Sequence, residues 1–124
     1  MDAPSVTAND ASGRRVLVVE DDYFIAEDIR RTLETNGVQV LGPVASVDDA
    51  LKVIETNETI DAAVLDINLS DVMVFPVADA LKTRGVPFVF ATGYEKTAIP
   101  ARFLDVEHRH KPVDFDAIKT IFAG

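Results

Sequence analysis

The chain has 124 residues, 48% of them hydrophobic and 27% charged, which is the composition of one globular domain. Its net charge of −9 argues against direct binding to nucleic acid, because phosphate contacts need clustered Lys and Arg. The chain has no cysteine, and therefore no disulfide or thiolate site. Without a membrane-length apolar run or a secretion signal, we expect a soluble, cytoplasmic protein that makes no membrane contact.

In chain order, residues 1–13 are small and polar and predict a flexible N-terminal arm ahead of a domain over 14–124. Apolar runs and helical spacings then alternate, so the sequence predicts five β and five α elements. The expected strands are 15–19, 38–42, 61–65, 86–91 and 107–110; the expected helices are 22–35, 47–57, 73–84, 95–104 and 114–122.

Some predicted strands are apolar on successive residues, as in VLVV at 16–19 and FVF at 88–90. Strands of this kind are typical of a parallel sheet covered by helices on both faces. The predicted helices carry one apolar stripe each; Ile25, Ile29 and Leu33, for example, recur every four residues. The sequence therefore predicts an α/β fold arranged as a three-layer α/β/α sandwich.

Polar residues follow four of the predicted strands. Glu20 and Asp21 follow the first, Asp66 the third, Thr92 the fourth and Lys111 the fifth. Because ligands of open α/β sheets bind outside the carboxyl ends of the strands, these side chains are expected to meet in one site.

Three carboxylates in one cleft repel each other and need a cation, and oxygen ligands select a hard ion such as Mg²⁺, for which Mn²⁺ can substitute. Glu20 and Asp21 are candidates to hold the metal, together with Asp66 and the backbone carbonyl of Asn68. Asp66 stands alone at its strand end and is the candidate nucleophile for a phosphoryl group.

Two further residues complete the expected phosphoryl site. The Thr92 hydroxyl can donate to a phosphoryl oxygen, and Lys111 adds a fixed positive charge. A cis bond at Pro112 would aim Lys111 inward. Taken singly, each motif has an ordinary structural explanation: an acidic pair caps helices, and Asp66 or Thr92-Gly93 can simply form turns. All four motifs at strand ends favour the phosphoryl site.

In this order VLVVEDD, VLDINL, FATGY and HKP resemble the receiver domain of response regulators over about residues 14–123. The resemblance implies a flavodoxin-like five-stranded parallel sheet in the order 2-1-3-4-5. It also implies that Glu20 and Asp21 bind Mg²⁺ with the main-chain oxygen of Asn68, that Asp66 accepts the phosphoryl group, and that Thr92 and Lys111 contact it.

Residues 90–94 also look like the FAT GUY subgroup of receivers, which the family associates with histidine kinases of the HWE or HisKA2 type. Two features depart from common receivers: only 19 positions separate Thr92 from Lys111, and His108 stands where a switch aromatic is usual. With Pro100 inside the interval, we expect a short or mobile fourth helix and an unconventional conformational readout.

Aromatic residues near the site have two interpretations each. Tyr23 and Phe24 are candidate docking residues for a kinase, or else the packed start of a helix. Tyr94 is a candidate partner contact or pocket lid.

Three classes of function follow from these observations. The leading one is a single-domain response regulator without an output domain, which is not an enzyme beyond its own phosphotransfer and dephosphorylation. It would be a monomer that signals by binding a target, or act as a phosphate shuttle or sink. The alternatives are a haloacid dehalogenase-like phosphatase, whose pattern wants Asp where this chain has Asn68, and a non-phosphorylated pseudo-receiver. The sequence names neither the cognate kinase nor the target.

Overall fold

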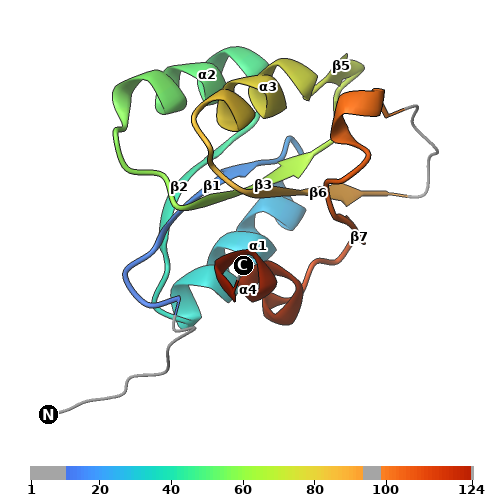
Figure 1. Cartoon of the computed structure of the whole chain (residues 1–124). Helices are drawn as coiled ribbons and strands as arrows, with labels where there is room; N and C mark the ends of the chain where they lie inside the picture. The colour runs from blue at the N-terminus through green and yellow to red at the C-terminus, as the bar shows by residue number, and fades with distance from the viewer. Residues whose placement is uncertain (1–10, 94–98, 124) are drawn as a thin grey trace, which may run out of the picture.

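The computed structural model describes residues 11–93 and 99–123 and contains a five-stranded parallel sheet in the order β2-β1-β3-β6-β7 (Figure 1). In the order of the main strands along the chain this is 2-1-3-4-5, so the predicted topology is confirmed. The strands are β1 (Arg15–Val19), β2 (Gln39–Val44), β3 (Ala62–Asp66), β6 (Phe88–Thr92) and β7 (His108–His110).

Helices cover both faces of this sheet. In Figure 1, α2 and α3 lie on one side and α1 and α4 on the other, which confirms the predicted three-layer sandwich. The helices are α1 (Tyr23–Thr35), α2 (Val47–Thr56), α3 (Phe75–Thr83) and α4 (Phe115–Ala123). Within the described residues, no helix combines the length and apolar character needed to cross a bilayer.

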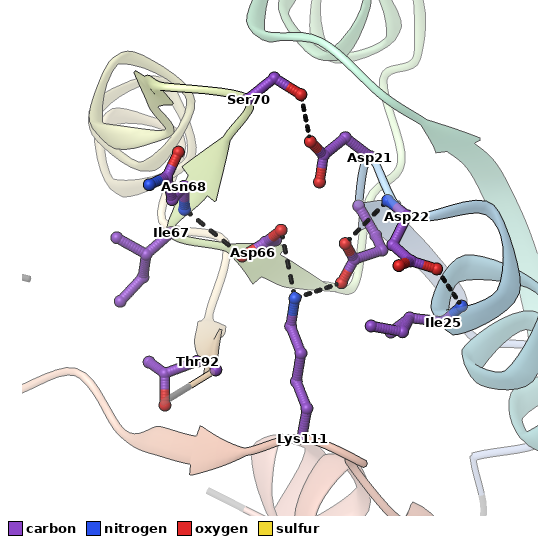
Figure 2. A pocket seen from close by; sticks show the side chains of 11 residues that line it. Asp21, Asp22, Ile25, Asp66, Ile67, Asn68, Ser70, Thr92 and Lys111 are labelled. Atoms are coloured by element: carbon purple, nitrogen blue, oxygen red, sulfur yellow. Dashed lines mark hydrogen bonds and ion pairs between the residues drawn. The ribbon is translucent and has the colours of Figure 1, made fainter. Parts of the chain in front are cut away.

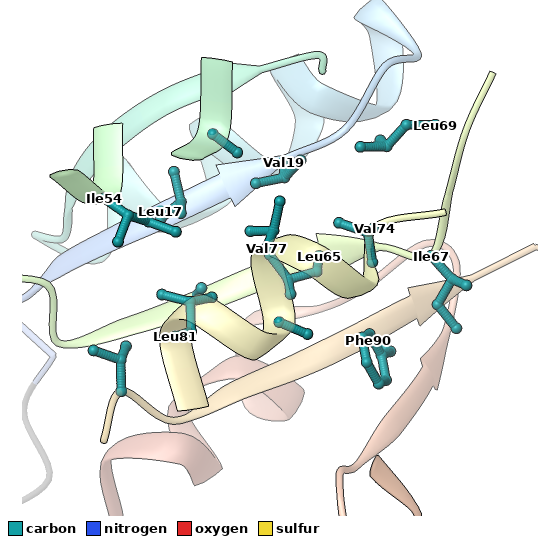
Figure 3. Close-up of a cluster of buried hydrophobic side chains, with 14 of the residues drawn as sticks. Leu17, Val19, Ile54, Leu65, Ile67, Leu69, Val74, Val77, Leu81 and Phe90 are labelled. Carbon is teal, nitrogen blue, oxygen red and sulfur yellow. The ribbon is translucent and has the colours of Figure 1, made fainter. Parts of the chain in front are cut away.

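Each face of the sheet has its own buried apolar cluster, which explains why the strands are apolar on successive residues. Leu17 and Leu65 pack in the cluster on the α2 and α3 side, with Leu81 of α3 (Figure 3). Their neighbours Val16 and Val64 point the other way and pack with residues of α1 and α4. Consecutive strand residues alternate between faces, so a central strand such as β1 contributes to both clusters because its successive positions are apolar.

Side chains fix where the first two helices begin. The Asp22 carboxylate accepts from the amides of Phe24 and Ile25 at 3.0 and 3.1 Å and caps α1. The Ser46 hydroxyl accepts from the Asp49 amide at 3.1 Å and caps α2. Such caps satisfy amide groups that the first helical turn leaves without partners.

A two-stranded hairpin that the sequence did not indicate lies directly after β3. It pairs β4 (Asn68–Leu69) with β5 (Val72–Met73) in antiparallel register. The expected third helix, 73–84, therefore begins later, at Phe75, because Val72 and Met73 are engaged in the hairpin.

The expected fourth helix, 95–104, is not an α-helix in its described part. Residues 94–98, including Tyr94, lie outside the described residues, and 101–103 form the 3₁₀ turn η1 (Ala101–Phe103). Pro100 precedes η1 with extended backbone, in keeping with the inability of proline to donate to a helical hydrogen bond. The part that is described is thus short, as expected.

The described structure begins inside the expected arm of 1–13. Ala11 is 3% exposed and belongs to the cluster on the α1 and α4 side. The Gly13 amide donates to the carbonyl of Gly37 at 2.8 Å, and the Arg14 amide donates to Ala11 at 3.0 Å. Residues 11–13 therefore pack on the domain, and the boundary expected at residue 14 lies too late in the chain.

Candidate functional site

The carboxyl ends of β1, β3, β6 and β7 bring the predicted polar residues into one pocket (Figure 2). Glu20 and Asp21 follow β1, Asp66 ends β3, Thr92 ends β6, and Lys111 follows β7. All five line the same cavity, which Asn68 and Ser70 also line. Residues up to 91 positions apart in the sequence thus share one site, as the strand-end argument predicted.

Lys111 is the positive centre of this pocket. Its Nζ lies 2.8 Å from Glu20 Oε1 and 3.2 Å from Asp66 Oδ2. Figure 2 shows Lys111 pointing toward Asp66. The contact with Glu20 is an ion pair rather than a hydrogen bond, since Glu20 Oε1 is buried and accepts no well-directed hydrogen bond. The Glu20 and Asp66 side chains are only 1% and 8% exposed, so this single ammonium faces two carboxylates away from water.

Asp66 carries the most perturbed carboxyl of the site. Burial raises the pKa of Asp66, the neighbouring Glu20 raises it further, and Lys111 opposes both, so that it reaches about 7. A carboxyl perturbed in this way, in a cleft with a charged partner, is typical of a functional position. Burial lowers the pKa of Lys111, but its two carboxylate partners, Glu20 and Asp66, outweigh this effect and raise the pKa overall.

Asp21 is held by Ser70, which no motif in the sequence indicates. Ser70 Oγ donates a hydrogen bond to Asp21 Oδ2 at 2.5 Å (Figure 2). Partial burial raises the pKa of Asp21, but hydrogen bonds, led by that from Ser70, outweigh this and lower it overall. The polar stretch after β3 was the only signal for Ser70, since its partner lies 49 positions earlier in the chain.

The turn that carries Ser70 has an unusual backbone. Ser70 and Asp71 have φ angles of 52° and 72°, which non-glycine residues rarely adopt. Such a conformation costs on the order of 1 kcal/mol or more per residue and persists only where its surroundings enforce it. Asn68 helps to enforce this conformation. Its side-chain Oδ1 accepts from the backbone amide of Asp71 at 2.8 Å, and its backbone amide donates to Asp66 Oδ1 at 3.3 Å.

Thr92 lines the pocket, but its hydroxyl does not meet Asp66 in this structure. Thr92 Oγ1 lies 3.5 Å from the carbonyl oxygen of Arg109, the outer limit for a hydrogen bond, and points away from Asp66 in Figure 2. Its carbonyl accepts from the Lys111 amide at 2.9 Å. The peptide bond between Lys111 and Pro112 is cis.

His108 and the aromatic pair of α1 lie outside the pocket. His108 is exposed, and its ring packs edge-on against Phe90 with centroids 5.5 Å apart. Tyr23 and Phe24 are 70% and 81% exposed, so they are not the packed helix start that was one interpretation of them. Phe24 lines an apolar groove, with residues of α1 and 111–113, beside the acidic pocket.

The acidic residues fit a hard divalent cation. Glu20, Asp21 and Asp66 each offer a carboxylate oxygen within 4.8 Å of the others, and oxygen-only donor sets suit Mg²⁺. The single ammonium of Lys111 leaves this cluster negative when all three carboxyls are ionised. The pocket is thus chemically suited to a cation that neutralises the excess charge.

An open parallel sheet with acidic residues and a lysine at its carboxyl edge defines the class of protein. Residues 16–123 match the model of the response regulator receiver domain, and the chain belongs to this family. It is therefore a receiver domain of two-component signalling.

Two solved structures are similar to this chain over most of its length. The solution structure of SdrG from Sphingomonas melonis Fr1 is similar, with 38% identity, a TM-score of 0.77, and coverage of 90% of this chain and 94% of SdrG. A receiver domain protein from Methanospirillum hungatei JF-1 has 29% identity and a TM-score of 0.77, over 90% of this chain and 95% of that one.

A curated relative is much longer than the region it shares. The phyllosphere-induced regulator PhyR of Methylorubrum extorquens is 33% identical over 94 residues, which are 74% of this chain. The chain spans only 33% of the length of PhyR, so the match covers one part of that protein.

Proposed function

We propose that this receiver domain accepts a phosphoryl group on Asp66 from the phosphohistidine of a histidine kinase. The observation that carries the proposal is the pairing of Lys111 Nζ with Asp66 Oδ2 and Glu20 Oε1 at 3.2 and 2.8 Å, where these two carboxylates cluster with that of Asp21. Asp66 is nearly buried, stands at the end of a strand and faces a pocket open to a donor.

In the proposed step, an Asp66 carboxylate oxygen forms a bond to phosphorus while the bond from phosphorus to the histidine nitrogen breaks. The electron pair of that bond stays on the imidazole. Lys111 is placed to compensate the charge that remains on the phosphoryl oxygens, an electrostatic role that such transfers require. After a rotation about its side-chain torsion, Thr92 can donate its hydroxyl hydrogen to one of these oxygens.

Glu20, Asp21, Asp66 and the main-chain oxygen of Asn68 would hold Mg²⁺, or Mn²⁺ in its place. When bound, the cation neutralises the carboxylates and polarises a phosphoryl oxygen. The fit rests on the oxygen-only donor set, on its excess negative charge, and on the raised pKa of Asp66 without a metal.

Intact-mass analysis tests the proposal directly. Incubation with MgCl₂ and acetyl phosphate should add one phosphoryl group to the wild-type chain and none to Asp66→Asn. EDTA should abolish the addition. If the wild type stays unmodified under conditions that phosphorylate an unrelated receiver, a pseudo-receiver acting only by binding becomes the better account.

For the partner, we propose a kinase of the HWE or HisKA2 type, on the basis of the FAT GUY-like residues 90–94 and the similarity to SdrG. The phosphorylated domain would then bind a target protein or pass the group on as a shuttle or sink. Readout through the segment that follows Thr92 is supported by the Phe90 ring, which contacts both His108 and Phe103 of η1.

The exposed pair Tyr23 and Phe24 is the proposed docking point for the kinase. Its two rings pack edge-on at 5.5 Å, and Phe24 borders the groove beside Lys111. Phe24→Ser should slow phosphotransfer from a HisKA2-type kinase about tenfold, in line with the loss of a buried aromatic anchor. Phosphorylation by acetyl phosphate should not change.

Leu104→Ser is a matched control for this docking test. Leu104 is 74% exposed, like Phe24, but lies next to η1 rather than beside the pocket. If both variants slow transfer from the kinase equally, docking at α1 is contradicted. It is also contradicted if Phe24→Ser slows phosphorylation by acetyl phosphate, which needs no kinase.

The alternative of a haloacid dehalogenase-like phosphatase is not supported. The family match places the chain among receivers. Asn68, at the position where that pattern wants an acidic group, instead uses its side-chain oxygen to accept from the Asp71 amide.

A further inference from the structure

The hydrogen bond between Ser70 and Asp21 joins two segments that the proposed metal site needs together. Asp21 follows β1, whereas Ser70 occupies the turn of the hairpin β4–β5, on the opposite side of the pocket (Figure 2). A hydroxyl has one hydrogen to donate, and Ser70 gives it to Asp21 Oδ2 at 2.5 Å. The Asp21 carboxylate thereby accepts one hydrogen bond and keeps further lone pairs for a cation.

Among the described residues, the other hydrogen bonds of this hairpin are local. Asn68 bonds to Asp66 and Asp71, and the Val74 amide donates to the carbonyl of Ile67 at 2.9 Å. Leu69, 3% exposed, packs in the core. These contacts shape the hairpin, whereas the Ser70 bond connects it to the opposite wall of the pocket.

The backbone at Ser70 argues that its side chain has a role beyond folding. At a φ of 52°, glycine or asparagine would be the less strained choice. A glycine there would relieve strain, yet it would remove the donor to Asp21. A serine at this position weakens the turn and supplies the hydrogen bond.

We propose that Ser70 is a positioning residue for divalent cation binding, an inference that rests on the proposed metal site. It holds the Asp21 carboxylate in one orientation and keeps the hairpin, with the Asn68 carbonyl, against that site. Partners that orient metal ligands typically contribute tenfold or more to metal affinity. Because Ser70 is exposed, we expect its loss to weaken Mg²⁺ binding about tenfold, at the lower end of that range.

Titration of the metal-free full chain with MgCl₂ by calorimetry tests this inference, with thermal unfolding measured in parallel. Ser70→Gly and Ser70→Ala should each weaken Mg²⁺ binding about tenfold, while Ser70→Gly unfolds at the same or a higher temperature than the wild type. Ser70→Asn tolerates the backbone conformation and retains an N–H donor, so it should recover most of the affinity.

A double-mutant cycle separates positioning from a general effect on the turn. In an Asp21→Asn background, where the amide is no longer a charged ligand, adding Ser70→Gly should change Mg²⁺ affinity less than twofold. A full tenfold loss in that background would overturn the inference, because Ser70 would then act independently of Asp21. Wild-type affinity in Ser70→Gly would overturn it as well.

These outcomes differ from a failure of the proposed function. If the wild type binds Mg²⁺ and Ser70→Gly binds it more weakly, but acetyl phosphate never modifies Asp66, the phosphoacceptor role fails and the positioning role stands. If the wild type is phosphorylated and Ser70→Gly binds Mg²⁺ equally well, the reverse holds. A wild type that does not bind Mg²⁺ at millimolar concentrations would overturn both the metal site and the role of Ser70.

Discussion

At the scale of single residues, the site combines two buried carboxylates with one ammonium. In the metal-free protein, burial and Glu20 raise the pKa of Asp66 to about 7 from an ordinary 3.8. A raised pKa means that the fold favours protonated Asp66. Its contribution to stability is therefore fully present below pH 3.8 and is lost as the pH rises through 7.

Asp66→Asn should remove this dependence. In EDTA, we expect the variant to match the wild type near the acidic end and to be more stable by about 1–2 kcal/mol at a pH above 7, after allowance for solvent screening. Urea unfolding followed by circular dichroism across this pH range measures the difference. If the difference in free energy of unfolding between the wild type and Asp66→Asn is the same at every pH, the cause given for the raised pKa is wrong.

Much of the site could be predicted because its residues end strands. Glu20, Asp21 and Asp66 each follow an apolar run, Lys111 follows the predicted strand 107–110, and parallel topology brings such strand-end positions together. Ser70 could not be predicted, because its role depends on a contact across the pocket rather than on a pattern around it. The orientation of the Thr92 hydroxyl is likewise a matter of one side-chain torsion, which spacing does not determine.

At the scale of elements, η1 is held to α3 and the sheet by its last residue, Phe103. Phe103 is fully buried, stacks on Phe75 with centroids 5.7 Å apart and meets Phe90 edge-on at the same distance. On the surface, Arg102 binds Asp79 with two hydrogen bonds of 2.7 and 2.9 Å and lies 4.6 Å from the Phe103 ring centroid.

Phe103→Ala should therefore destabilise the domain by about 3–5 kcal/mol, the usual cost of removing a buried aromatic side chain. The neighbouring Leu104→Ala is the control, because Leu104 is 74% exposed and should change the free energy of unfolding by less than about 0.5 kcal/mol. Urea unfolding gives both values. A loss below about 1 kcal/mol for Phe103→Ala would mean that η1 contributes little to the fold.

The two strands of the hairpin could not be predicted from the sequence, for a physical reason. The strands β4 and β5 have two residues each, too short for a periodic pattern, and their turn lacks the Asn-Gly or Gly pairs that mark hairpins. The long strands and α1 were predictable because their apolar residues repeat over several turns or positions. In the 95–104 interval, Pro100 predicted a short or mobile helix, and the described part holds only the 3₁₀ turn η1.

At the scale of the whole molecule, the net charge of −9 implies mutual repulsion in the folded state at neutral pH. Salt screens such repulsion, with a Debye length near 10 Å at about 0.1 M. We therefore expect the unfolding temperature in EDTA to rise by a few degrees as NaCl increases from roughly 0.05 to 0.5 M. A steady fall over this range would show that the local ion pairs outweigh the net charge.

The two apolar clusters on opposite faces of the sheet have a consequence for how the sequence can vary. Leu33 on one face and Leu81 on the other belong to different clusters, with the sheet between them. Their substitutions should act additively on the free energy of unfolding, since distant sites without shared partners rarely couple. A substitution in one cluster would then leave the packing of the other intact, so the two helical layers can change independently while the strands between them keep the same carboxyl edge for the site.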